Sequence, residues 1–238
     1  MRPKVCRDPT RGQWQRSRAP LRNNTMTSAV PRAMRFAGVP LPPSRRAEHT
    51  MGMPQATHHW TPDDVRTLPD DGRRYEVVAG ELLVTPAPSF AHQEAVRLLI
   101  RALGDHVEHT GIGHAAISPA DLTPEPGALV QPDVFVVPLV SGRRPRDWHD
   151  IERLVLAVEV LSPSTARADR TVKRRLYQRT SVPEYWIVDL EARLVERWRP
   201  ADERPEVLTD TLSWVPAPGT GSLTIDLPEF FTKVLGDA

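Results

Sequence analysis

Two carboxylates in this sequence lie inside apolar runs, where an unpaired charge is costly. Asp133 stands in the segment VQPDVFVVP and Glu159 in the segment RLVLAVEVL. Such runs, rich in Val and Leu, are typical of strands that are buried on both faces, and a buried carboxylate without a partner costs several kcal/mol. A shared proton, an arginine or a divalent metal ion must therefore compensate these two charges.

The spacing of the two acids brings them together if their strands are antiparallel neighbours. Pairing Asp133 with Glu159 puts the midpoint at residue 146, inside the polar loop SGRRPRDWHD. Residues that lie directly opposite each other share one face of the sheet. Oxygen ligands without a cluster of His or Cys favour Mg²⁺ or Mn²⁺ over zinc. The alternative is a structural pair between arginine and carboxylate, which this arginine-rich chain can easily supply.

Lys173 stands out because the chain otherwise prefers arginine. Only three of its 31 basic residues are lysine, and Lys173 lies on a predicted helix over 165–180, directly after the segment that holds Glu159. A compact ammonium group and a planar guanidinium are not interchangeable at a reacting centre. The alternative is an exposed ion pair with Asp169, four residues earlier on the same helix face.

Hydrophobic periodicity predicts the elements that must position these residues. Helices are expected over 60–69, 90–109, 165–180 and 228–235, and strands over 75–85 (a hairpin), 130–138, 154–161, 184–190, 194–200 and within 205–227. This order indicates an α/β or α+β fold, with a central mixed β-sheet flanked by helices and an N-terminal β-hairpin.

Composition divides the chain into a basic tail and an acidic remainder. The first 50 residues hold eleven Arg or Lys against two acids, which leaves 20 basic and 28 acidic residues in the rest. Segment 1–56 is rich in Pro, Arg and Ser and is predicted to be disordered, whereas 57–238 should form one domain. The absence of a long apolar stretch and of an apolar signal segment predicts a cytoplasmic protein without a membrane span.

Several stretches of this domain resemble a known family. The segments QPDVFVV, AVEVLSPST and ADRTVKRRLYQRTSVPEYWIVD resemble the Uma-two family of proteins classed with restriction endonucleases, a branch of the PD-(D/E)xK nuclease superfamily. The segment YEVVAGELLVTPAPSFAHQEAV is similar to the N-terminal part of that family. The resemblance covers about residues 58–235. It implies a restriction-endonuclease-like core that hydrolyses DNA phosphodiester bonds with Mg²⁺ or Mn²⁺, and we expect a homodimer.

The resemblance implies catalytic roles for Asp133, Glu159 and Lys173. Asp133 corresponds to the aspartate of the PD motif and Glu159 to the acidic member of the (D/E)xK motif, and both would hold the metal ion. The lysine departs from the superfamily pattern, because Leu161 stands two residues after Glu159. The following helix offers Lys173 in its place.

Four further residues are accessory candidates. The additional N-terminal acid of the superfamily most resembles Glu76, with Glu81 as its competitor, and a two-residue turn would place both on one face of the hairpin. His92, near the start of the first long helix, and Tyr177, one turn after Lys173, are candidates to contact the substrate or the catalytic residues. A helix cap for the histidine and a core position for the tyrosine are the alternatives.

A second function stays open at this point, namely a catalytically inactive protein of nuclease fold that acts as a nucleic-acid-binding or dimeric interaction module. The acidic balance of the domain favours it, because affinity for a duplex comes largely from Lys and Arg. A local patch of arginines could still serve a nuclease: Arg143, Arg144, Arg146, Arg174 and Arg175. A glycosidase with two carboxylates would leave the lysine without a role.

Overall fold

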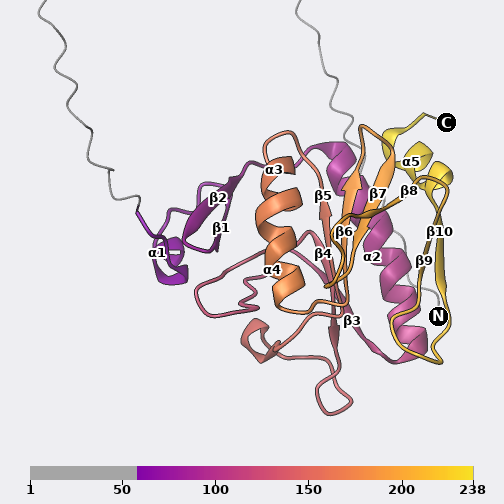
Figure 1. The fold of residues 1–238 in the computed structure, drawn as a ribbon, viewed down its shortest axis with the longest axis horizontal. Helices are drawn as coiled ribbons and strands as arrows, with labels where there is room; N and C mark the ends of the chain where they lie inside the picture. Colours follow the sequence, from indigo (N-terminus) through magenta and orange to yellow (C-terminus); the bar gives the residue numbers. More distant parts are fainter. Residues whose placement is uncertain (1–57, 238) are drawn as a thin grey trace, which may run out of the picture. The chain divides into compact units, whose positions relative to one another are not determined.

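The computed structural model of the protein describes residues 58–237 and places helices on both faces of a central sheet (Figure 1). The tail predicted to be disordered, residues 1–56, lies outside the described residues. Within 58–237, no helix combines the length and the apolar character that crossing a membrane requires. The expected architecture of a mixed sheet flanked by helices is confirmed.

The central sheet has six strands in the order β3-β4-β5-β6-β7-β8. Its strands are β3 (Gly113–Ile117), β4 (Val134–Pro138), β5 (Leu156–Val160), β6 (Glu184–Asp189), β7 (Leu194–Trp198) and β8 (Glu206–Leu208). β5 and β6 run parallel, whereas the other neighbouring pairs are antiparallel. A parallel pair needs a crossover connection, and the helical segment between β5 and β6 provides it.

Two small sheets accompany the central one. β1 (Arg74–Val78) and β2 (Glu81–Thr85) form the predicted N-terminal hairpin with its two-residue turn. β9 (Thr211–Trp214) and β10 (Leu223–Asp226) form the second. The sequence predicted edge strands within 205–227, but only β8 joins the edge of the central sheet, because β9 and β10 pair with each other.

Helices cover both faces of the central sheet: α2 (Phe90–Thr110), α3 (Ala166–Ala168), α4 (Arg174–Arg179) and α5 (Leu227–Leu235). The first helix, α1 (Pro62–Arg66), packs instead with the hairpin, where Val65 shares a small core with Val77 of β1. In Figure 1, α2 and α5 lie on one side of the sheet, and α3 and α4 lie on the other. Val134 and Val136 of β4 belong to the core with α2, whereas Phe135 and Val137 belong to the core with α4. By the same alternation, Asp133 faces α3 and α4.

The predicted signals at helix ends are present. The side chain of Ser89 accepts a hydrogen bond from the His92 N–H at 3.2 Å where α2 begins, and Gly111 ends this helix with φ 67°. Thr61 and Asp64 form a capping box at the start of α1. These local bonds satisfy backbone groups that a helix leaves without intrahelical partners.

The predicted helix over 165–180 contains an irregular turn. Between α3 and α4, residues Asp169–Lys173 form a π-helical turn, so the chain is helical throughout but wound more widely at this point. Such turns occur frequently at functional sites, because they change the direction of the side chains on the helix. Both the first and the last residue of this turn, Asp169 and Lys173, are buried.

Strand β3 was not predicted. Its sequence, GHAAI, contains a single β-branched residue, so the local signal for a strand is weak. The strand forms because its backbone pairs with β4, with Gly113 opposite Pro138. A Cβ atom on Gly113 would lie 2.3 Å from the carbonyl oxygen of Val137, which explains why a glycine stands here.

Candidate active site

The register of β4 and β5 brings the two acids of the apolar runs together. The strands are antiparallel, and Val134 lies opposite Val158. One further step along this register places Asp133 opposite Glu159, as the sequence predicted. Both carboxylates are buried, with 4% and 2% of the residue surface exposed.

Lys173 lies at the centre of a buried cluster of carboxylates. Its Nζ atom is 2.9 Å from Oε1 of Glu159, 2.8 Å from Oε2 of Glu76 and 3.5 Å from Oδ1 of Asp169. The ion pair with Asp169 is therefore present, but the expectation that this pair is exposed is wrong, since both side chains are buried against β5 and the hairpin. The π-helical turn directs both side chains inward.

The hairpin contributes one of its two candidate acids to this cluster. Glu76 is fully buried, and its Oε1 accepts a hydrogen bond from the Gln131 N–H at 2.7 Å. Glu81 pairs with Val78 at the turn and remains exposed. The geometry thus brings Glu76, but not Glu81, to Lys173.

Asp133 is held by the side chains of an arginine and a histidine and by a backbone amide. Its Oδ1 lies 2.7 Å from Nη1 of Arg74 and 3.2 Å from Nε2 of His92, and its Oδ2 accepts the Val160 N–H at 2.8 Å. His92 therefore contacts a predicted catalytic residue, while its backbone also belongs to the first turn of α2. Arg74 was not predicted, although its position two residues before Glu76 on the same face of β1 was a usable signal.

Tyr177 reaches the other acid. Its hydroxyl lies 3.5 Å from Oε1 of Glu159, and its ring is fully buried against Tyr185, with 4.7 Å between the ring centroids. Tyr177 is thus a core side chain that also contacts the carboxylate cluster.

The surroundings of Asp133 keep its carboxylate ionised. Burial alone would raise the pKa of this group. The hydrogen bond from His92 and the charge of Arg74 outweigh that effect and lower the pKa to about 2.

At Glu159 the balance differs, because burial outweighs the nearby positive charge. Burial raises the pKa of Glu159 well above its usual value, and the charges of Asp169 and Asp133 add to the effect, although Lys173 opposes it. Burial opposes protonation of Lys173, yet the charges of Glu159 and Glu76 hold its pKa well above the usual value. Three carboxylates thus share one ammonium group, and a further cation at this point would be favourable.

A cavity of about 320 Å³ opens onto both acids. Its lining includes Arg74, His92, Asp133, Glu159 and Lys173. Among residues 58–237, no group of three or more His, Cys, Asp or Glu side chains is arranged to hold a metal ion. Mg²⁺, however, is usually bound by one or two carboxylates and completes its shell with water. Two buried carboxylates on one cavity, within an excess of negative charge, fit that donor set.

The comparison with protein families agrees with this picture. The family model Uma2, described as "Putative restriction endonuclease", matches residues 62–228. The chain belongs to the Uma2 family. The matched span contains every predicted site residue, and membership in Uma2 supports a nuclease function.

A solved structure supports the fold. The chain is similar to a crystal structure described as a putative nuclease belonging to DUF820, from Anabaena variabilis ATCC 29413, with a TM-score of 0.59 and 20% sequence identity. The similarity covers 74% of this chain and 99% of the other chain. Among curated proteins, no match was found.

Proposed function

We propose that this Uma2 protein is a Mg²⁺-dependent endonuclease that hydrolyses phosphodiester bonds in DNA, with Mn²⁺ as an alternative metal. The observation that supports the proposal best is the convergence of Asp133, Glu159 and Lys173 on one cavity. Asp133 directly precedes β4, Glu159 lies in β5 and Lys173 in the π-helical turn, so no local sequence pattern requires them to meet.

The proposed roles follow from the contacts of each side chain. Asp133 and Glu159 would hold the metal, which lowers the pKa of bound water and neutralises charge on the phosphate. His92 orients Asp133, and Tyr177 orients Glu159. Lys173 holds the carboxylates in place and supplies positive charge next to the reacting phosphate.

One observation favours the alternative of a catalytically inactive protein that binds nucleic acid or forms a dimer. Arg74 and His92 already compensate the charge of Asp133 without any metal ion. If Arg74 and His92 always occupy Asp133, this carboxylate cannot bind a metal ion and the protein does not cleave DNA. The site is then a buried ion network that stabilises one arrangement of the fold.

Cleavage of supercoiled plasmid DNA distinguishes the two functions. We expect cutting in Mg²⁺ but not in Ca²⁺, and a loss of roughly 100-fold or more in Lys173→Ala, the magnitude seen when one preorganised donor is removed. Lys173→Arg should not restore activity, because the planar guanidinium cannot take the place of the compact ammonium.

Lys233→Ala is the matched control. Lys233 is the other lysine among residues 58–237, and it forms an exposed ion pair with Glu229 on α5. Circular dichroism would check the fold of each variant. Full activity of Lys173→Ala would remove this residue from the mechanism, and a wild-type protein that binds DNA without cutting it would favour the inactive module.

A further inference from the structure

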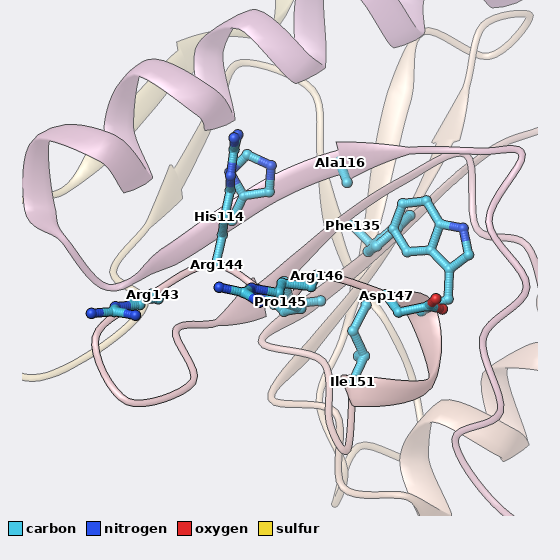
Figure 2. A pocket seen from close by; sticks show the side chains of 11 residues that line it. His114, Ala116, Phe135, Arg143, Arg144, Pro145, Arg146, Asp147 and Ile151 are labelled. Atoms are coloured by element: carbon cyan, nitrogen blue, oxygen red, sulfur yellow. The ribbon is translucent and has the colours of Figure 1, made fainter.

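A second cavity is larger than the one beside the carboxylate cluster and has no role in the chemistry proposed above. It has a volume of about 960 Å³ and lies between β3, β4 and the loop that joins β4 to β5 (Figure 2). Its lining includes Arg143, Arg144, Arg146 and Trp148. We call it the arginine pocket.

The arginine pocket lies on the same face of the sheet as the candidate active site. Phe135 and Val137 of β4 line the pocket, and Asp133 precedes them with its side chain on the same face. A strand rises about 3.3 Å per residue, so roughly 13 Å separate Asp133 from Val137 along β4. A ligand of the length of a few nucleotides can therefore contact both places.

The guanidinium groups of the pocket are exposed and are not neutralised by neighbouring acids. Among residues 58–237, no carboxylate lies within ion-pairing distance of Arg143, Arg144 or Arg146. Asp147 also lines the pocket, where its carboxylate contacts His149. Asp150 contacts His149 too and accepts the backbone N–H of Arg146, not its guanidinium. The pocket thus offers positive charge to a ligand in a domain that is acidic as a whole.

The loop that carries these arginines is braced at both ends. Val140 and Arg143 exchange two backbone hydrogen bonds, of 2.7 and 3.0 Å. At the other end, Asp147 and Asp150 form a capping box around the short helix that begins at Trp148. A loop held in this way has less conformational entropy to lose when it binds a ligand.

Trp148 adds an aromatic surface to the charge. Its residue surface is 42% exposed, although tryptophan is usually well covered. The buried ring of Phe135 meets it edge-on, with 6.0 Å between the ring centroids. An exposed aromatic ring beside arginines is the combination that single-stranded nucleic acids bind, with bases stacked on the ring and phosphates on the cations.

We propose that the arginine pocket binds the polynucleotide strand next to the site of cleavage, with Arg144 and Arg146 on its phosphates and Trp148 stacked on an unpaired base. The inference rests on the proposed function, because it takes the strand to be the one whose phosphodiester bond lies at Asp133. Figure 2 shows Arg143 at the end of the pocket far from Asp147, so this arginine would reach only a more distant phosphate.

Binding of fluorescently labelled DNA in Ca²⁺, followed by anisotropy, tests the proposal without cleavage. We expect Arg144→Ser/Arg146→Ser to weaken binding of a single-stranded 20-mer at least about 10-fold and to reduce the slope of log K against log salt by about 1 to 2. Arg101→Ser/Arg204→Ser, which removes two exposed arginines elsewhere, should bind like the wild type. Arg144→Lys/Arg146→Lys should retain most of the affinity.

Trp148 is tested with the same oligonucleotide. Loss of one stacked base weakens binding by about 5- to 100-fold, so we expect a decrease in this range for Trp148→Ala and recovery in Trp148→Phe. The decrease should be smaller with a fully paired duplex, in which each base already has a partner.

Wild-type affinity in Arg144→Ser/Arg146→Ser or in Trp148→Ala, with an intact fold by circular dichroism, would overturn the proposal. A wild-type protein that binds DNA but does not cut it would refute the nuclease function alone, and the same binding constants would still judge the arginine pocket. A wild-type protein that binds no DNA would overturn both.

Discussion

Among single residues, Lys173 explains how the apolar strand β5 tolerates Glu159. The ammonium group has three N–H donors, and three carboxylates surround it: Glu76, Glu159 and Asp169. Removing one partner of such a network leaves an uncompensated buried charge, which is strongly destabilising. The rarity of lysine in this chain was thus a useful signal for a position with special chemistry.

Arg74 would compete with a bound metal ion for the carboxylate of Asp133. Its guanidinium lies 2.7 Å from Oδ1 of Asp133, one of the proposed metal ligands. We expect Arg74→Ala to bind Mn²⁺ about 10-fold more tightly or better, because a charge-assisted hydrogen bond no longer competes with the metal. Isothermal titration calorimetry with the metal alone measures this affinity, independently of cleavage.

The neighbouring Arg73→Ala provides the control for this experiment. Arg73 is exposed and pairs with Asp71 outside the cavity, so its removal should leave the affinity for Mn²⁺ unchanged. Weaker binding in Arg74→Ala would contradict the prediction and would mean that the guanidinium supports the ligand set instead of competing with the metal.

Among the secondary-structure elements, the hairpin and the π-helical turn complete the site. β1 brings Arg74 to Asp133 and Glu76 to Lys173. The carbonyl oxygen of Asp169, the first residue of the π-helical turn, accepts the backbone N–H of Arg174 and also the hydroxyl of Tyr185, 3.2 Å away. In a regular α-helix the angle between successive residues about the helix axis would differ. Asp169 and Lys173 would then not both point into the carboxylate cluster in the same way.

The hairpin turn is a position where stability can be gained without a change in the site. Ala79 and Gly80 both have positive φ, 51° and 79°, as a type I′ turn requires. Ala79→Asn should raise the free energy of unfolding by up to about 1 kcal/mol, since asparagine tolerates this conformation better than alanine. Thermal unfolding measures the gain, and the plasmid assay should show unchanged cleavage.

Gly80→Ala is the opposite change in the same turn. Its Cβ atom would lie 2.1 Å from Nδ1 of His59 while the backbone keeps positive φ. This variant should melt at a lower temperature than the wild type. A stabilising Gly80→Ala, or a destabilising Ala79→Asn, would show that the turn differs from type I′.

For the whole molecule, the buried ions make the stability of the protein depend on pH. The pKa of Asp133 falls to about 2 in the folded chain from 3.8, so its ionised form stabilises the fold. This contribution, about 2 kcal/mol, is present above pH 4 and is lost as the pH falls toward 2. Urea unfolding should therefore show wild type losing about 1 kcal/mol more than Asp133→Asn between pH 6 and pH 3.

Asp105→Asn, an exposed substitution on α2, is the control for this comparison. It should keep the pH dependence of the wild type. Equal pH dependence in the wild type and in Asp133→Asn would contradict the expectation that folding stabilises the ionised carboxylate.

The homodimer expected from the sequence stays a prediction, which sedimentation can test on the same samples.

Periodicity and end signals sufficed to predict most elements of the domain. Local features such as the cap of α2, the turn of the β1–β2 hairpin and the apolar runs of β4 and β5 depend on residues close in sequence, so a single sequence contains them. The opposition of Asp133 and Glu159 was a hypothesis that assumed antiparallel pairing of the two apolar runs. The connection over 139–155 is too long to fix the register, which the pairing of β4 with β5 supplies.

The contacts of Arg74 with Asp133 and of Glu76 with Lys173 were decided only by the tertiary structure. Arg74 and Glu76 come from a hairpin that packs on the domain through non-local contacts, such as the backbone bonds between Val77 and Leu129. The π-helical turn and the weak strand β3 likewise form because packing and strand pairing outweigh local propensity. The sequence by itself thus determined which residues must find a compensating charge, whereas long-range packing decided which side chains provide it.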